Sequence, residues 1–151
     1  MDVPFDILSK MERFCAFQER SEAEVRKKLN ATPLSMAQRD EIVRRLQEDD
    51  FLNEKRFVEI FVRSKIKEQW GKYKIKQALF AKGISASITD AALEALDATA
   101  YSEMLATCVE KWKRQHTADA HERNKLIRFL LTRGFEMDEI LNIVKNNDCN
   151  F

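Results

Sequence analysis

Lysine and arginine side chains near the middle of the sequence are the groups with the clearest capacity for binding chemistry. Between residues 63 and 82 the only acid is Glu68. The cations of this run are Arg63, Lys65, Lys67, Lys72, Lys74, Lys76 and Lys82. Clustered cations attract phosphate groups or acidic protein surfaces. At about 100° per residue, one side of a helix over this run carries Lys72, Tyr73, Lys76 and Phe80.

A second group of cations lies closer to the C-terminus. Its members are Lys111, Lys113, Arg114, Arg123, Lys125, Arg128 and Arg133. Because the net charge of the chain is only +1, any basic surface has to be local, and its concentration in two stretches favours a binding role. Ordinary solvated helix surface is the alternative, and it would account for about half of these cations.

The sequence matches the known residue patterns for catalysis and for metal binding poorly. His116 and His121 are five residues apart, whereas two ligands on one helix face need a spacing of four. Even with Asp119 between them, two solvated histidines are favoured over a metal site. The acids at residues 48–50 suit a helix joint better than an acid/base pair. The sequence has no phosphate-binding glycine loop and no nucleophile elbow, so we expect no enzyme, cofactor or metal.

The elements that must position the cations are predicted to be helices. Three Gly and two Pro are few for a sheet protein, which needs turn residues every few positions. Apolar periodicity indicates nine helices. They lie near residues 5–19, after Ser21, after Ser35, and near residues 54–70, 71–83, 86–96, 100–115, 119–134 and 137–147.

Residues at the expected helix ends support this assignment. Capping-box spacing occurs in three pairs, Ser21 with Glu24, Ser35 with Gln38 and Asp119 with Glu122. Asn53 is suited to begin the fourth helix, and Gly71 is expected to break it. Gly83 and Gly134 are expected to end helices in the left-handed conformation, which glycine adopts without steric cost.

A pattern of one long and two short helices occurs three times. Apolar positions align at a shift of 50 residues and then of 51. The aligned sets are Val25, Ile75 and Leu126; Leu29, Leu79 and Leu130; Val43, Leu93 and Val144; Met11, Phe61 and Trp112; and Ile7, Phe57 and Cys108. This periodicity predicts an all-α, elongated array of three tandem three-helix repeats, at residues 1–52, 53–98 and 99–151.

The cysteines and the hydropathy of the sequence indicate in which cellular compartment the protein is expected. Cys15, Cys108 and Cys149 are an odd number of widely spaced thiols, and no signal peptide or run of about 18 apolar residues is found. These features favour a cytoplasmic protein with reduced thiols and no membrane contact. We also expect a monomer.

Four segments in order resemble the RecX family of bacterial recombination regulators. They are Glu19-Arg20-Ser21 continuing to Leu29, Phe51-Leu52-Asn53 continuing to Val62, Trp70-Gly71 continuing to Ile84, and Thr132-Arg133-Gly134-Phe135 continuing to Ile140. The family often has Asp where this chain has Asn53, and the joint at residues 32–34 lacks the glycine found in the other two copies. The resemblance covers nearly the whole chain, and it too implies a triple three-helix architecture.

The resemblance implies a non-enzymatic modulator, mostly an inhibitor, of the RecA recombinase in DNA repair, recombination and the SOS response. Its implied partner is the RecA filament on single-stranded DNA, where it would hinder ATP hydrolysis, strand exchange and filament extension. The family defines no sharp binding motif, so the candidate residues come from the charge pattern. They are Arg56, Arg63, Lys67, Lys72, Tyr73, Lys74, Lys76, Phe80, Arg123, Lys125, Arg128 and Arg133.

Two other functions stay open from the sequence. Three-helix units with basic faces are similar to helix-turn-helix domains, so a stand-alone DNA-binding module is the main alternative. Weak direct contact with DNA is compatible with either function, because the net charge is close to zero. The second of these other functions is a passive helical scaffold for another protein.

Overall fold

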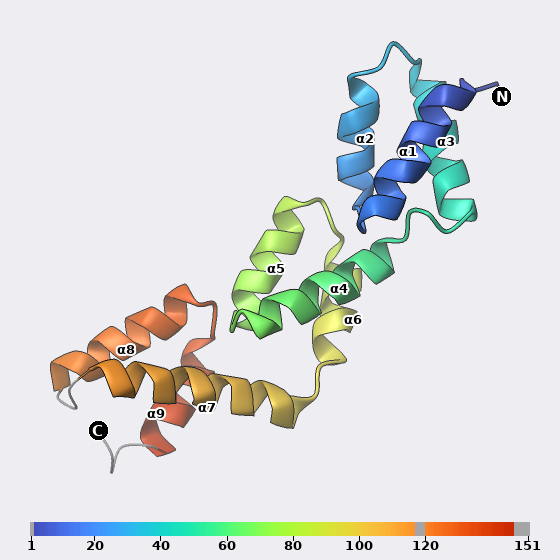
Figure 1. Ribbon diagram of the computed structural model, residues 1–151. Helices are drawn as coiled ribbons and strands as arrows, with labels where there is room; N and C mark the ends of the chain where they lie inside the picture. The colour runs from blue at the N-terminus through green and yellow to red at the C-terminus, as the bar shows by residue number, and fades with distance from the viewer. Residues whose placement is uncertain (1, 117–119, 147–151) are drawn as a thin grey trace.

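The computed structural model describes residues 2–116 and 120–146, and all the regular secondary structure in these residues is helical (Figure 1). The helices are α1 (Phe5–Phe17), α2 (Glu22–Asn30), α3 (Met36–Glu48), α4 (Glu54–Lys67), α5 (Lys72–Ala81), α6 (Ala86–Glu94), α7 (Ala98–Gln115), α8 (Ala120–Thr132) and α9 (Met137–Asn146). The predicted all-α class is confirmed.

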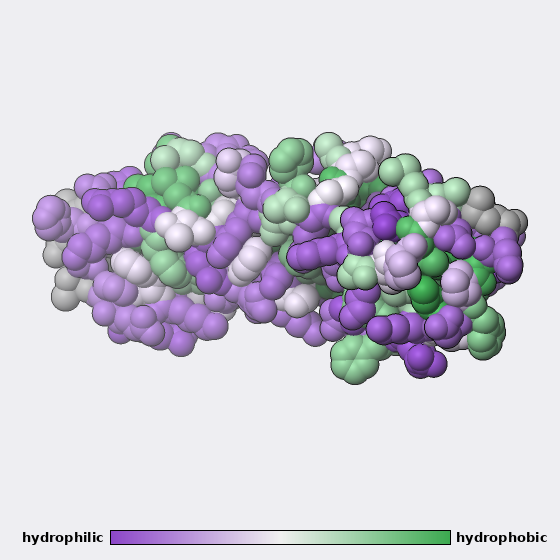
Figure 2. Space-filling model, turned by 90° about the horizontal axis from the view of Figure 1, so that it is seen from above, coloured by the Kyte–Doolittle hydropathy of each residue, from purple (hydrophilic) through white to green (hydrophobic). Residues whose placement is uncertain are grey.

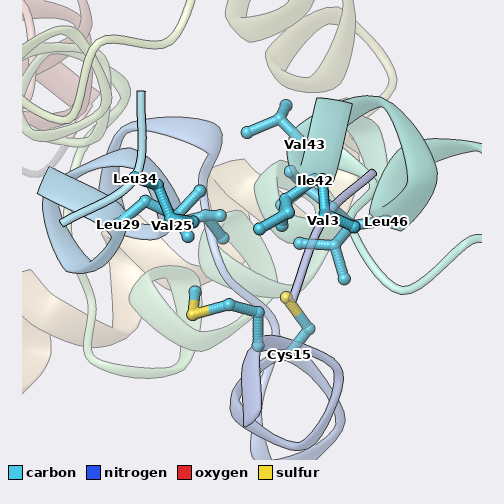
Figure 3. Close-up of a cluster of buried hydrophobic side chains, with 10 residues drawn as sticks. Val3, Cys15, Val25, Leu29, Leu34, Ile42, Val43 and Leu46 are labelled. Atoms are coloured by element: carbon cyan, nitrogen blue, oxygen red, sulfur yellow. The ribbon is translucent and has the colours of Figure 1, made fainter. Parts of the chain in front are cut away.

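Each set of three consecutive helices encloses its own hydrophobic core. Figure 3 shows the first core, where Val25 and Leu29 of α2 and Ile42 and Leu46 of α3 are buried together. Three of the five aligned sets are buried in every copy, and two of these are 0% exposed throughout: Val25, Ile75 and Leu126; Leu29, Leu79 and Leu130. In the other two sets Ile7, Phe61 and Trp112 are partly buried against their cores. Since a three-helix unit has a single interior, the same columns of the sequence fill it each time.

The three units follow one another along an elongated molecule. In Figure 1, α4 starts beside the first unit and runs into the second, and α7 leads from the second unit to the third in the same way. The first unit is α1–α3, the second α4–α6 and the third α7–α9. The boundaries at residues 53 and 99 stay predictions, compatible with these cores. Within the described residues, no helix is long and apolar enough to cross a bilayer.

Side chains cap several helices as the sequence predicts. The Ser35 hydroxyl accepts a hydrogen bond from the Gln38 N–H, and the Gln38 side chain accepts one from the Ser35 N–H, which completes a capping box. Ser21 accepts from the Glu24 N–H in the same manner. The Asn53 side chain accepts from the N–H of the third residue of α4. The predicted cap at Asp119 lies outside the described residues.

The end of α4 differs from the prediction. The helix stops at Lys67, three residues before Trp70, and Gln69 takes the left-handed conformation with φ of 63°. Gly71 therefore does not break α4; it is the N-cap of α5, with an extended backbone. Gly83 and Gly134 have φ of 80° and 97°, which confirms their predicted role.

The two cysteines within the described residues are packing groups. Cys15 and Cys108 are buried and unbonded, each in the core of its unit. Burial raises the pKa of both thiols, because a thiolate would be poorly solvated there. Low reactivity follows for both. Cys149 lies outside the described residues.

Candidate partner-binding surfaces

The start of α5 meets the end of α8; these are the second helices of the second and third units. The Gly71 N–H donates to the Arg133 carbonyl at 2.7 Å, and the Tyr73 N–H donates to the Gly134 carbonyl at 3.0 Å. The first N–H groups of α5, which a helix cannot satisfy internally, are thus paired with carbonyls that follow α8. The two backbones touch, since a Cβ built on Gly71 would lie 2.2 Å from the Gly134 carbonyl carbon.

Two side chains complete this joint. The Arg133 guanidinium donates to the Gln69 carbonyl at 3.2 Å and also to the Glu68 carbonyl. The Tyr101 hydroxyl of α7 accepts from the Lys72 N–H at 3.0 Å. Burial raises the pKa of the Tyr101 phenol, so the hydroxyl remains neutral at physiological pH. Arg133, a predicted binding residue, is therefore engaged in joining the second and third units.

Removing the Tyr101 hydroxyl tests this joint. Tyr101→Phe is expected to lower the free energy of unfolding by about 1–2 kcal/mol, because the partly buried Lys72 N–H loses its acceptor. Tyr73→Phe is the matched control: its ring is 56% exposed, so a change of less than about 0.5 kcal/mol is expected. Urea denaturation of both variants measures the difference. Equal effects would contradict the assigned role.

The joint between the first and second units is held differently. A Cβ built on Gly83 would lie 3.6 Å from the Ala23 Cβ, which is ordinary contact. The Arg56 guanidinium instead bonds the Glu19 carboxylate at 2.6 Å and the Asp50 carboxylate at 2.9 Å. The hydrogen bond to Glu19 raises the pKa of Arg56. Arg56, a predicted binding residue, is therefore engaged in holding this joint.

Several predicted lysines lie against aromatic rings. The Lys74 ammonium is 4.1 Å from the Trp70 ring centroid, and Lys65 approaches the same ring at 4.6 Å. The Lys72 ammonium is 4.7 Å from the centroid of Tyr101. Cation–π contacts of this kind hold Lys72 and Lys74, both half-buried, close to the joint.

The outer face of α5 carries three exposed residues of the predicted set. Tyr73 is 56% exposed and Phe80 is 76% exposed, and Lys76 between them pairs with Asp90 at 3.0 Å. Rings exposed to this extent leave apolar area that a binding partner can bury. Figure 2 shows that, on the face in view, apolar side chains form small separate groups within a mostly hydrophilic surface.

The cations of α8 have mixed surroundings. Arg128 is exposed, and Lys125 pairs with Glu122 at 3.1 Å. Arg123 is half-buried and engaged with other groups. At the shift of 51, Arg128 corresponds to Gln77 on the outer face of α5. Tyr73 and Phe80 of that face correspond to Asn124 and Leu131, so the two helices occupy equivalent places in the repeat but present different side chains.

Arg63 and Lys67 lie elsewhere, on the exposed rim of a groove between α4 and α6. The groove has a volume of about 760 Å³, and Lys55 lines it as well. Sequence reasoning missed Lys55, although it shares a four-residue spacing with Glu59, Arg63 and Lys67. None of the lining residues belongs to α5, so the structure divides the predicted set between two surfaces.

The histidine region contains no metal centre that the described residues could form. The His116 ring stacks on Trp112, with centroids 3.6 Å apart, and its Nδ1 lies 2.9 Å from the Trp112 carbonyl. Within residues 2–116 and 120–146, no three His, Cys, Asp or Glu side chains are grouped as metal ligands would be. Asp119 lies outside those ranges.

Comparison with known proteins places the chain in a family. Residues 53–93 match the second three-helix domain of RecX, and residues 103–144 match its third. The regulatory protein RecX of Salmonella paratyphi A is 31% identical over 151 residues, which cover 93% of this chain and 90% of that protein. The same-named protein of Chlorobium phaeobacteroides is 34% identical over 129 residues, covering 85% and 84%.

Solved structures agree with this match. The crystal structure of RecX from Lactobacillus salivarius superposes with a TM-score of 0.82 at 29% identity, covering 95% of this chain and 98% of that one. A further RecX crystal structure, at 23% identity, also gives 0.82 and shares the fold. The chain belongs to the RecX family of regulatory proteins.

Proposed function

We propose that this chain binds the RecA recombinase filament on single-stranded DNA and mostly inhibits its ATPase, strand exchange and filament extension. The setting would be DNA repair and recombination, including the SOS response, in the cytoplasm, with the chain acting as a monomer without catalytic activity. Membership of a family of regulatory proteins supports this proposal.

The observation that carries the proposal is the end-to-end alignment of α5 and α8. Their direct backbone hydrogen bonds hold two corresponding helices of neighbouring units in a fixed arrangement. A filament repeats identical subunits along its length, so the two helices could contact neighbouring subunits together. Linked weak contacts reinforce each other through effective concentration, and they need no single strong site.

Stand-alone DNA binding is less well supported. In a helix-turn-helix domain the last helix enters the major groove and contacts the base edges. The corresponding α6 contains no lysine or arginine, and α9 contains only Lys145. In α3, Arg44 and Arg45 are paired with Glu41. Arg39 of α3 is hydrogen-bonded to the Asn30 side chain and the Thr32 carbonyl. The third helices therefore offer few cations for phosphate contacts.

The direct test is the ATP hydrolysis of the recombinase on single-stranded DNA. Addition of the full chain is expected to lower the rate in a concentration-dependent manner that saturates. An unchanged rate, together with failure to sediment with filaments, would sink the proposed function.

Phe80 offers a test of the α5 face. Phe80→Ala is expected to weaken filament binding about tenfold, because exposed aromatic residues are common anchors of interfaces. The free energy of unfolding should change by less than about 0.5 kcal/mol, since the ring is mostly solvated. Phe17→Ala is the matched control, because Phe17 is equally exposed, at 83%, but lies on the first helix of a unit. Equal inhibition constants for wild type and Phe80→Ala would exclude this face.

A further inference from the structure

The groove between α4 and α6 is built by small residues on α6. Ser87, Ala91 and Ala95 follow one another at four-residue spacing and line it. At the shift of 50, α3 of the first unit has Ala37, Glu41 and Arg45. There the Arg45 guanidinium and the Glu41 carboxylate pair at 3.1 Å. The second unit has alanines at the two corresponding positions, so no such ion pair fills its groove.

The floor of the groove is apolar. Val62 and Ile66 of α4 and Ile88 and Leu96 from the α6 side line it, and of these only Val62 is fully buried. Apolar side chains that remain partly exposed in a groove of about 760 Å³ favour an apolar occupant.

Charge lies along one rim. Lys55, Arg63 and Lys67 of α4 line the groove, with Glu59 as the only acid among its lining residues, and α6 adds no charged side chain. None of the three cations forms an ion pair with a described residue. From Lys55 to Lys67 the rim runs about 18 Å, which is 12 residues at 1.5 Å each. An occupant that lies along this rim is favoured if it carries negative charge.

We propose that this groove binds an amphipathic helix of a partner protein, with apolar residues on the floor and acidic residues along α4. A helix of about 12 residues matches the length of the rim. The small side chains of α6 allow its backbone to approach closely. The recombinase supplies this helix if the proposed function holds, so the partner's identity rests on that function, whereas the chemistry of the site does not.

A designed peptide tests the site without the recombinase. The probe is a stapled helix of about 12 residues with leucines on one face and glutamates on one flank; a second version has lysines on that flank. The full chain is expected to bind the glutamate version at least about tenfold more tightly, by fluorescence anisotropy. Equal affinity for both peptides, or binding of neither, would overturn the proposal.

Filling the groove gives the second arm of the test. Ala91→Glu with Ala95→Arg transfers the ion pair of α3 to α6 and adds no net charge. This double variant should lose at least about tenfold in affinity for the glutamate peptide and for RecA filaments. Thr107→Arg, four residues after the exposed Glu103 on α7, is the matched control and should leave both affinities unchanged. Circular dichroism verifies that each variant folds.

Reversing the charge of the α4 rim distinguishes between the possible occupants of the groove. Arg63→Glu with Lys67→Glu should also lower both affinities about tenfold and leave the binding of naked single-stranded DNA unchanged. If the charge-reversed variant also lost binding to DNA, the occupant of the groove would be nucleic acid. If the wild type were a dimer that became monomeric when the groove is filled, the occupant would be a second copy of this chain. Either result overturns the proposal. If the wild type binds the peptide but not filaments, the proposed function fails while the groove assignment stands.

Discussion

Gly71→Ala is expected to destabilise the protein by about 3 kcal/mol and to separate the third unit from the second. The added Cβ would meet the Gly134 carbonyl carbon at 2.2 Å and the Phe135 nitrogen at 2.3 Å. Both are backbone atoms, so no side chain can move aside to relieve the overlap. The hydrogen bonds from Gly71 and Tyr73 across the joint would break, each worth about 1 kcal/mol. Small-angle X-ray scattering should then show a broader distribution of intramolecular distances.

Gly83→Ala is the control for this prediction. Gly83 has a left-handed backbone, with φ of 80°, so alanine there is strained by about 1–2 kcal/mol. Its neighbour across the other joint, the Ala23 Cβ, lies 3.6 Å away and leaves room for a methyl group. The control should lower stability moderately and leave the scattering profile unchanged. If the two variants gave the same profile, the Gly71 contact would not fix the arrangement of the units.

Leu79→Ala is expected to destabilise the second and third units together. Leu79 is 0% exposed, and truncation of such a leucine costs about 2–5 kcal/mol. Ile66 packs against the cores of both the second and the third unit, and the backbone hydrogen bonds at Gly71 tie them further. Amide hydrogen exchange should therefore accelerate in α4–α9 as one cooperative block, and less in α1–α3.

Leu29→Ala is the matched substitution in the first unit. Leu29 is also 0% exposed, and the first core shares none of its residues with the other two. Faster exchange should be confined to α1–α3, because the joint to the second unit consists of side-chain contacts such as that of Arg56 with Glu19. Acceleration across the whole chain would mean that all three units unfold as one.

Sequence reasoning predicted the fold well, and for a physical reason. A repeated three-helix unit buries the same columns each time, so its periodicity is visible as the alignment of Leu29, Leu79 and Leu130. The left-handed ends at Gly83 and Gly134 follow from local conformational rules. The predicted end of α4 was wrong because Gln69 adopts the left-handed conformation, for which glutamine has no special preference.

The candidate site was harder to predict, because charge alone does not show which cations are already engaged. Arg133 reaches carbonyls at residues 68 and 69, and Arg56 reaches Glu19, contacts that no local pattern contains. Lys72 lies over Tyr101, 29 residues further along the chain. Phe80 is 76% exposed, and its counterparts in the other copies, Asn30 and Leu131, show that this position is not a core column of the repeat.

The most direct test of the central claim is sedimentation of the full chain with RecA filaments assembled on single-stranded DNA, at physiological salt. A parallel sample contains the same DNA without recombinase. The proposed function predicts that the chain sediments with filaments and stays in the supernatant with naked DNA, whose binding its net charge of +1 does not favour. Equal sedimentation in both samples, or in neither, would contradict it.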